Sequence, residues 1–517
     1  MTFRSVLKTT LKISLGVFAF VGLCAVLWLA WVLYINLFDE PLTPEAEALL
    51  SYKAKALPDA ENGYVMLAGF TAPAGSDWKK VGAERIARYN EQVRASRRGG
   101  DESEANVSAE EETQRLTFSE CGGCEKILRL SSGNSETTLL ASLQALLQQK
   151  EQIEKAFSDN AELISRYEAL QSASDFSETA LPSLEVSAKS DEKEVLMLSV
   201  IPIRRLLLHK VTLAALYDDR EPLLNFLERD ISLWRLVMKS DTGPSTAMFA
   251  SELLISELRF LRALLAQIDF SASELNRLSY LLTPLSEKEL SFLRTLEYEW
   301  NSIAKTFMIM EKNFYSRQNY HSSLIYLRKW LFQPRASINL FAKKTSHWRK
   351  VASLPSLELA AYRSVIRESQ EEKEDVVGIF SFFQKPFNYL GRSEVMKVAE
   401  IGDRSYEKAI AMRHDIAAAL QLIRAVLELR MARIYVEKNP EAVSEFLAQA
   451  GEETMNPYTG KPFEWNEGCR RLSFTPQNAD YRVFYEVNLT EVSEENAVAC
   501  AASTKSSRIA GHSNNSD

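Results

Sequence analysis

The feature that most constrains this chain is an uncharged, apolar stretch close to its N-terminus. From Ile13 to Phe38 no residue carries a charge, and only Ser14 and Asn36 are strongly polar. A helix rises about 1.5 Å per residue, and roughly 20 apolar residues cross the hydrocarbon core of a bilayer. The stretch is therefore long enough to span a membrane with some tilt, and we predict one transmembrane helix over residues 13–38.

The charges around this stretch predict its orientation. Arg4, Lys8 and Lys12 precede it, and the first acidic residue is Asp39. Because positively charged flanks stay in the cytoplasm, residues 1–12 are expected there, with the bulk of the chain in the periplasm of a bacterial-type inner membrane. Rings that favour the headgroup region lie towards the C-terminal end of the stretch: Trp28, Trp31 and Tyr34.

A cleaved signal peptide is the alternative to an anchor. Its apolar region is about 7–15 residues long and ends at a small-x-small site. The present run is longer, and Tyr34–Phe38 is no such site. Cys24 follows the bulky Leu23 where a lipoprotein signal has a small residue. These differences favour an uncleaved anchor.

Composition indicates a packed, helical protein. The chain has 517 residues, of which 46% are hydrophobic and 25% charged, with only 19 Gly and 16 Pro. Few turn formers argue against an all-β or low-complexity chain. The formal net charge is −8, and three of the 61 basic groups but no acidic group lie before residue 39. The exported part is thus clearly acidic, which argues against a nucleic-acid ligand.

Helical patterning continues after the apolar stretch. Thr43-Pro44-Glu45 predicts a helix to about Lys55, whereas Tyr64–Leu67, after a turn at Asn62-Gly63, reads as a short strand. Residues 97–113 read as a polar, acidic loop. Apolar periodicity predicts further helices from Ser76 or Asp77 to Ser96, from Ser135 onward, and over 192–217, 222–238, 246–268, 273–282, 287–311, 353–369, 403–438 and 441–450.

The pattern changes after residue 451. Turn residues at 456–462 are followed by Phe463–Trp465, Leu472–Phe474 and Tyr481–Tyr485, which predict the strands of a small β-element. We therefore predict a mainly α protein in which one transmembrane helix precedes a large helical domain. Its divisions are a cytoplasmic N-terminus (1–12), the span (13–38), membrane-proximal helices with an acidic loop (39–134), the helical domain (135–450), a β-containing element (451–500) and a disordered tail (501–517).

Several short segments stand out in the chain: Gly63–Phe70 with Ala72–Gly75, Leu331–Pro334, Phe387-Asn388 before Arg413–Arg430, and Asn456–Pro462. With these segments the chain resembles an uncharacterised family of proteobacterial single-pass inner-membrane proteins with a large periplasmic helical domain. The resemblance implies a topology, but no activity and no catalytic residues. Asn456–Trp465 is also similar to the C-terminal β-turns of pseudopilins.

Four cysteines follow the apolar stretch and predict disulfides: Cys121, Cys124, Cys469 and Cys500. Three connectivities are possible, and proximity favours Cys121–Cys124 and Cys469–Cys500. The C-x-x-C pair could instead exchange disulfides or bind a metal. However, no apolar strand precedes the pair, and no His or Cys follows before His209 to complete a zinc site.

No motif commits the chain to a chemistry. There is no P-loop, G-x-G-x-x-G, G-x-S-x-G or H-E-x-x-H. The histidines are scattered at positions 209, 321, 347, 414 and 512. Arg413-His414-Asp415 is expected to be a solvated or packed trio, not a catalytic one. No cofactor, metal or catalytic residue is predicted.

One segment has an unusual charge. Between Ser302 and Leu357 stand ten Lys or Arg and nine aromatic residues, with Glu311 as the one acid. Such a stretch suits an anionic or membrane surface. The residues we predict for this role are Arg328, Lys329, Trp330, Lys343, Lys344, Trp348, Arg349 and Lys350. Alternatively, the aromatic residues form core while the basic ones pair with acids at 287–299 or 368–375.

These observations favour a membrane-anchored periplasmic scaffold, accessory or binding protein of the cell envelope. Its expected partners are the inner membrane, through residues 13–38, and an envelope protein or anionic envelope component. An envelope enzyme with a site assembled from scattered residues, or a C-x-x-C redox protein, is the alternative.

Overall fold

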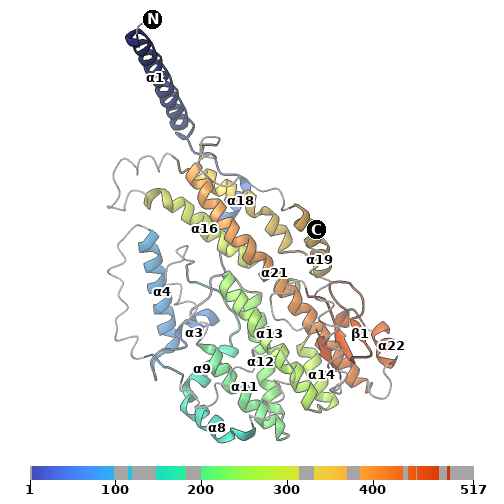
Figure 1. The fold of residues 1–517 in the computed structure, drawn as a ribbon. Coiled ribbons are helices and arrows are strands. Elements are labelled where there is room, and N and C mark those ends of the chain that lie inside the picture. Colours follow the sequence, from blue (N-terminus) through green and yellow to red (C-terminus); the bar gives the residue numbers. More distant parts are fainter. Residues whose placement is uncertain are drawn as a thin grey trace.

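The protein is mainly helical, with one small sheet, as the sequence predicts. The structure, a computed structural model, describes residues 3–97, 115–118, 147–181, 199–313, 331–369, 385–434, 441–449, 451–476 and 486–489. Within these ranges the helices pack side by side into an elongated body. Helix α1 projects from one end of that body, and the sheet lies towards the other end (Figure 1).

Helix α1, Phe3–Ile35, contains the predicted span. Its segment Lys12–Ile35 has a mean hydropathy of 2.4 and is a candidate membrane span by length and composition. Large apolar side chains are exposed along it; Phe18, for example, is 76% exposed. The helix ends three residues before the predicted boundary at Phe38, because the chain turns into the domain at the buried Asn36.

Helix α2, Pro44–Ser51, begins as predicted but ends early. The Thr43 side chain accepts a hydrogen bond from the Ala46 N–H, which caps the first turn. The predicted end at Lys55 is wrong. After Ser51 the chain is drawn to Asp241, whose carboxylate accepts the Tyr52 hydroxyl at 3.0 Å and the Lys55 backbone N–H at 2.8 Å.

The strand predicted over Tyr64–Leu67 is wrong, because these residues lie in helix α3, Gly63–Gly69. The Asn62 side chain accepts the Tyr64 N–H at 3.0 Å and starts the helix. All seven residues of α3 are buried, so the segment lacks the polar face that marks most helices. It packs on helix α4, Trp78–Arg97, which the sequence did predict.

The helices predicted over 222–238, 246–268 and 273–282 are confirmed with shifts of one or two residues at their ends, as α12 (Glu221–Met238), α13 (Pro244–Gln267) and α14 (Ala272–Leu281). Helix α11 (Val200–Leu216) lies within the predicted 192–217, whose first residues, 192–198, are outside the described part. The helical stretch predicted from Ser135 onward contains α8 (Lys150–Asp159) and α9 (Ala161–Gln171), and residues 135–146 are outside the described part. Helix α14 starts with a capping box: the Ser271 side chain accepts the Glu274 N–H, and the Glu274 carboxylate accepts the Ser271 N–H.

The helix predicted over 287–311 is divided into α15, Glu287–Leu290, and α16, Leu293–Asn313. The buried Arg413 occupies the break. Its guanidinium donates to the carbonyl oxygen of Glu289 at 3.1 Å and to that of Ser291 at 2.6 Å. These carbonyl groups are therefore bound by a side chain and not by a continuing helix.

Three helices follow. Helix α18, Pro334–Val351, was not predicted, whereas α19, Ser356–Ser369, agrees with the sequence. Helix α21 extends over Tyr389–Met431, so both predicted ends, Asp403 and Lys438, are wrong. It starts directly after Asn388, which adopts a left-handed conformation, and it stops before Arg433, which has a φ of 54°.

The C-terminal β-element contains three antiparallel strands in the order β1-β2-β3: β1 Glu464–Asn466, β2 Arg471–Ser473 and β3 Glu486–Asn488. The first two agree with the prediction. Tyr481–Tyr485, predicted as the third, lies outside the described residues. Helix α22, Glu441–Gln449, also agrees with the sequence.

Of the four cysteines predicted to form disulfides, the structure describes Cys469, which is 7% exposed between β1 and β2. Its predicted partner Cys500 is outside the described part, as are Cys121 and Cys124. The disulfides stay predictions.

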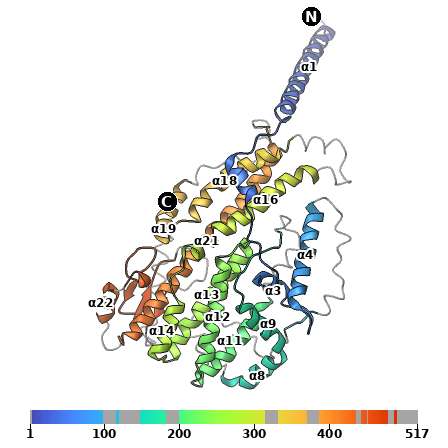
Figure 2. The same cartoon turned by 180° about the vertical axis from the view of Figure 1, so that it is seen from behind.

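Helix α21 joins two hydrophobic cores. The one nearer α1 contains α2, α16, α18 and the first part of α21, including Tyr406 and Ile410. The distal one contains α3, α9, α11 to α14 and the second part, from Met412 onward. Figure 2 shows α21 crossing behind both groups of helices. The predicted trio lies at this transition and is fully packed: Arg413, His414 and Asp415 are each 0% exposed.

Candidate functional site

The last turn of α1 is hydrogen-bonded into the helical domain through Asn36. The Asn36 side chain donates to the Pro386 carbonyl oxygen at 3.3 Å and accepts the Asn388 N–H at 2.8 Å. Its own carbonyl oxygen accepts the Gln333 side-chain amide at 2.5 Å. The end of the candidate span is therefore fixed to the segments that precede α18 and α21.

Asp39 adds a second attachment. Its carboxylate accepts the backbone N–H groups of Arg335 at 2.7 Å and Ala336 at 2.9 Å. These are orphan donors of the first turn of α18, and a carboxylate there is also favoured by the helix dipole. A residue that follows α1 thus caps a helix nearly three hundred positions further along the chain.

The linker from α1 to α2 then lies along α18. The Asn339 side chain accepts the Thr43 N–H at 2.9 Å and donates to the Pro41 carbonyl oxygen at 2.9 Å and, more weakly, to Glu40 at 3.4 Å. One α18 amide therefore satisfies polar groups on both sides of Pro41. These hydrogen bonds of Asn339 hold the linker against α18.

The start of α21 packs closely on the other side of α18. Asn388 accepts the Gln333 N–H at 2.8 Å, and Leu390 donates its N–H to the Leu331 carbonyl oxygen at 3.0 Å. Gly391 fits here because it has no side chain: a Cβ would lie 2.0 Å from the Ser337 hydroxyl oxygen and 2.2 Å from the Asn388 amide oxygen. This glycine sets the separation of the two helices.

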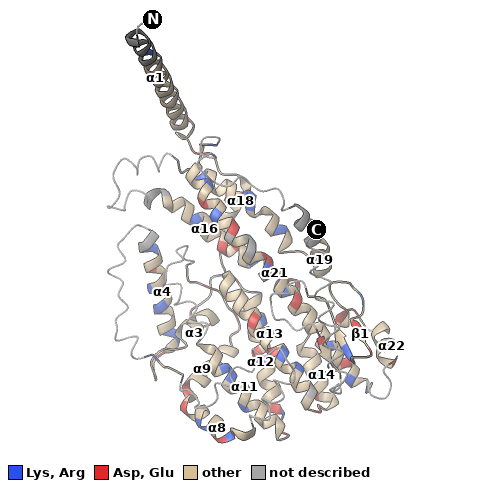
Figure 3. Ribbon diagram, in the orientation of Figure 1, with Lys and Arg blue, Asp and Glu red and all other residues tan. Residues whose placement is uncertain are grey.

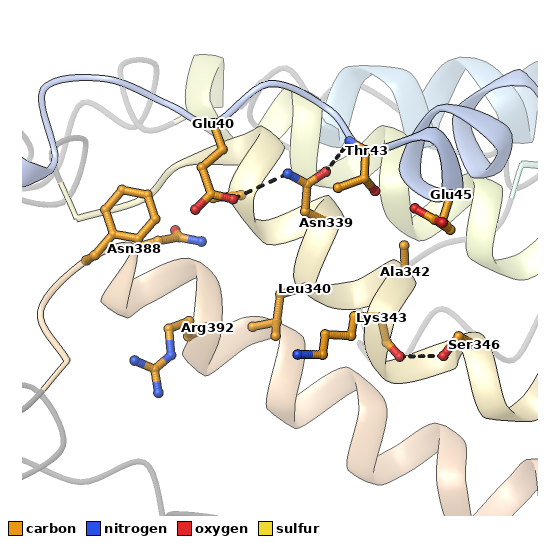
Figure 4. Close-up of a pocket in the computed structure, with 12 residues that line it drawn as sticks. Glu40, Thr43, Glu45, Asn339, Leu340, Ala342, Lys343, Ser346, Asn388 and Arg392 are labelled. Carbon is orange, nitrogen blue, oxygen red and sulfur yellow. Dashed lines mark hydrogen bonds between the residues drawn. The ribbon is translucent and has the colours of Figure 1, made fainter.

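Between the linker, α18 and α21 lies a cavity of about 570 Å³, which we call the α1-proximal groove (Figure 4). Apolar contact is available from Leu340 and Phe387, and both signs of charge line the space. The lining residues are Glu40, Thr43, Glu45, Ala336, Asn339, Leu340, Ala342, Lys343, Ser346, Phe387, Asn388 and Arg392. Its volume suits a small ligand or a headgroup.

The structure separates the basic and aromatic residues predicted for an anionic surface. Lys343 lines the groove, and Lys350 is exposed elsewhere on α18. Lys344 is half-buried. Arg349 lies 3.8 Å from the Glu297 carboxylate, one of the acidic residues considered as pairing partners. Arg328, Lys329 and Trp330 lie outside the described residues.

Trp348 is not an interfacial ring. It is 2% exposed and packs edge-on against Tyr406, with 6.0 Å between ring centroids. Phe307 and Phe341 likewise form a buried edge-to-face pair. For these rings the structure favours the first half of the alternative, in which the aromatic residues form core; its second half, pairing of the basic groups with acids, is seen for Arg349 with Glu297. Figure 3 shows Lys and Arg residues of α18 at the end of the body nearest α1.

The polar cluster around Asp230 is closed to ligands. Asp230, 0% exposed, accepts hydrogen bonds from Tyr167 at 2.5 Å and Arg204 at 2.7 Å, and Arg204 also pairs with the buried Glu257. Burial raises the pKa of Glu257 well above its usual range, and the Arg204 charge offsets this only in part. Burial also acts on Asp230, but Arg204 and the surrounding donors outweigh it and lower the pKa of that carboxyl.

The Arg413–Asp415 trio also has structural partners. The Ser356 hydroxyl and the His414 Nδ1 are 2.7 Å apart, and Asp415 accepts the Tyr458 hydroxyl at 2.6 Å. These contacts join α21 to α19 and to the β-element. Among the described residues, no group of three His, Cys, Asp or Glu side chains is arranged to hold a metal ion.

Glu40, Glu45 and Arg392 were missed from the sequence. They come from the linker, from α2 and from α21, and only the chain's return to the end of α1 brings them to one cavity. Lys343 was found through its basic neighbourhood. No family model matches this chain, and no curated protein or solved structure matches it either.

Proposed function

We propose that the chain is a membrane-anchored, non-enzymatic binding protein of the bacterial cell envelope, whose α1-proximal groove binds lipid headgroups at the membrane surface. One observation carries this proposal. The end of the apolar helix is built into the groove's own walls, through Asn36 to the start of α21 and through Asp39 to the start of α18.

Exposure around the junction supports a membrane surface at this level. Leu37 and Phe38 are 54% and 78% exposed, although both follow the end of the helix. Exposed apolar residues next to a span are stable in the bilayer interface, and the first charge comes only at Asp39. Glu40 and Thr43, which line the groove, follow within a few residues, at about 3.3 Å of chain per residue. The groove therefore opens near the headgroup layer.

Orientation and compartment belong to the same proposal. The basic residues before the span favour a cytoplasmic N-terminus, which puts the helical domain in the periplasm. The resemblance to a family of proteobacterial inner-membrane proteins agrees with this placement. The lack of a catalytic motif in the sequence favours binding over catalysis.

Photocrosslinking in intact cells tests the function. A photoreactive amino acid replaces Ser346, which is exposed and lines the groove, or Tyr280, which is 83% exposed on the distal helix α14. We expect lipid adducts from position 346 and none from position 280. Adducts with a protein alone at position 346, or equal lipid labelling at both positions, would contradict the proposal.

A further inference from the structure

Charges of opposite sign stand on different elements of the α1-proximal groove. Lys343 belongs to α18 and Arg392 to α21, whereas Glu40 lies in the linker and Glu45 in the first turn of α2. Figure 4 shows the two carboxylates on the chain segment that passes over α18, and the two basic side chains on the helices beneath it.

These four charged side chains do not form ion pairs with one another. No cation among them lies within 4.0 Å of an acidic oxygen of the other two, although all line one cavity. Arg392 donates to the Lys385 carbonyl oxygen at 3.2 Å, and Glu40 receives only the 3.4 Å contact from Asn339. Within the described part of the chain, the Lys343 and Glu45 side chains have no hydrogen-bond or ion-pair partner. A ligand that carries both signs could contact both sets.

The side-chain chemistry restricts that ligand. A guanidinium and an ammonium together suit the oxygen atoms of a phosphoester, while two carboxylates accept the N–H donors of a primary ammonium. A quaternary ammonium is better held by an aromatic cage, and among the described residues Phe387 is the one ring that lines the groove. A headgroup with negative charge alone would face Glu40 and Glu45 without compensation.

The position of the groove indicates that its ligand comes from the membrane. Its lining begins at Glu40, two residues after the exposed Phe38, so an acyl chain could follow α1 while the headgroup lies among the charges. We propose that the groove binds the zwitterionic headgroup of a phospholipid, with the phosphate at Lys343 and Arg392 and a primary ammonium at Glu40 and Glu45. This inference rests on the proposed function and names the ligand class of the same groove.

The test uses the full-length protein in nanodiscs that contain equal amounts of phosphatidylethanolamine, phosphatidylglycerol and phosphatidylcholine. After mild extraction, native mass spectrometry counts the lipids retained by each variant. One variant combines Lys343→Gln with Arg392→Gln, and another combines Glu40→Gln with Glu45→Gln. Lys350→Gln is the matched control, since Lys350 is exposed on α18 but does not line the groove.

We expect the native protein to retain phosphatidylethanolamine over either other lipid by about tenfold, the value of one charge-assisted hydrogen bond. The basic double variant should lose this retention, the acidic one should change its preference to phosphatidylglycerol, and Lys350→Gln should match the native protein. Circular dichroism melting curves identify any double variant that is unfolded, and the single variants Lys343→Gln and Glu45→Gln then replace it, with loss of retention expected from the first and a change towards phosphatidylglycerol from the second.

Three results would overturn the inference, each in a separate way. Preference for phosphatidylglycerol in the native protein would refute the zwitterion but leave lipid binding intact. Displacement of the bound lipid by soluble glycerophosphoethanolamine at equal concentration would refute the membrane source. Equal retention by the native protein and the basic double variant would refute phosphate binding at Lys343 and Arg392. In that case the lipid adducts at position 346 decide whether the proposed function, lipid binding in the groove, survives.

Discussion

Asp39 caps the helix that begins at Pro334: its carboxylate accepts the Ala336 N–H at 2.9 Å across 297 positions of sequence. Caps normally come from the residue directly before a helix. Gln333, in the N-cap position of α18, has no side-chain cap bond, and its amide donates instead to the Asn36 carbonyl oxygen. The segment after α1 therefore supplies the acceptor for the first turn of α18, and the residue before α18 supplies a donor for the end of α1.

The Asp39 cap should be measurable. Asp39→Ala leaves two N–H groups of α18 without an acceptor, and we expect it to lower the free energy of unfolding by about 1–2 kcal/mol. Asp39→Asn should retain only part of the stability, because its one amide oxygen can accept one of the two N–H groups and its NH₂ group cannot accept the other. Urea unfolding of the full chain in detergent, followed by circular dichroism, gives both values. Asp59→Ala is the control, since the Asp59 side chain is exposed and has no hydrogen bond or ion pair with any described residue. Equal losses for Asp39→Ala and Asp59→Ala would contradict the account.

The separation of α18 and α21 should depend on Gly391. Gly391→Ala puts a methyl group 2.0 Å from the Ser337 hydroxyl oxygen, so the helices must move apart. Overpacking of this kind costs about 1–3 kcal/mol and should also weaken lipid retention by the groove. Gly451→Ala is the matched control, because its Cβ would meet no atom within 4 Å. Thermal melting and lipid counting measure the two effects, and a neutral Gly391→Ala would show that the helices are not in tight contact.

The two buried carboxyl groups of the distal core, Asp230 and Glu257, should contribute unequally to the free energy of unfolding. Asp230→Ala leaves Arg204, Tyr167 and Trp234 without their common acceptor, and we expect a loss of about 3–5 kcal/mol. Glu257→Gln should cost less than about 1 kcal/mol, because the raised pKa of Glu257 already favours its neutral form. Denaturant midpoints of the two variants provide the comparison. A larger loss for Glu257→Gln would mean that Glu257, and not Asp230, carries the charge that balances Arg204.

Much of the helical organisation could be predicted from the sequence, and the misses have physical reasons. Helix α14 was found because its apolar residues recur at helical spacing, and Leu275 and Leu278 are buried in the structure. Helix α3 was missed because every residue is buried and its apolar run has no period. Helix α18 carries a helical pattern in Ile338, Phe341, Thr345 and Trp348, which its many basic residues obscured.

The groove itself could not be predicted. The linker contributes Glu40, and α21 contributes Arg392 some 350 positions later, and no local pattern relates them. The charge excess of the 302–357 segment did indicate Lys343. The same excess wrongly suggested that Trp348 lies at a membrane or anionic surface. The sequence alone does not distinguish a tryptophan buried in the core from one exposed at such a surface.

Stability should fall as the pH rises through the range in which Glu299 titrates. Burial raises the pKa of Glu299 to about 7, and the hydrogen bond from the Tyr406 hydroxyl at 2.5 Å partly offsets this. The unfolded carboxyl titrates near 4.5, so the folded state holds the extra proton between these values. The native protein should therefore lose stability between about pH 4.5 and 7, by on the order of 3 kcal/mol, and no more from this group above that range.

Glu299→Gln removes this titration while an amide oxygen still accepts the Tyr406 hydroxyl. The variant should be more stable than the native protein at pH 8 and close to it at pH 4.5. Unfolding curves at several pH values, with the native chain alongside, measure the difference. A gain of the same size at both pH values would assign the effect to packing and not to a proton.

The central claim is that the α1-proximal groove lies at the membrane surface, and depth-dependent fluorescence quenching tests it most directly. A fluorescent amino acid is placed at Lys343 in the groove or at Tyr280 on the distal helix α14, in full-length protein reconstituted into vesicles. Lipids with a nitroxide on the headgroup then act as quenchers. We predict strong quenching at position 343 and little at position 280. Weak quenching at both positions, or the reverse order, would contradict the claim.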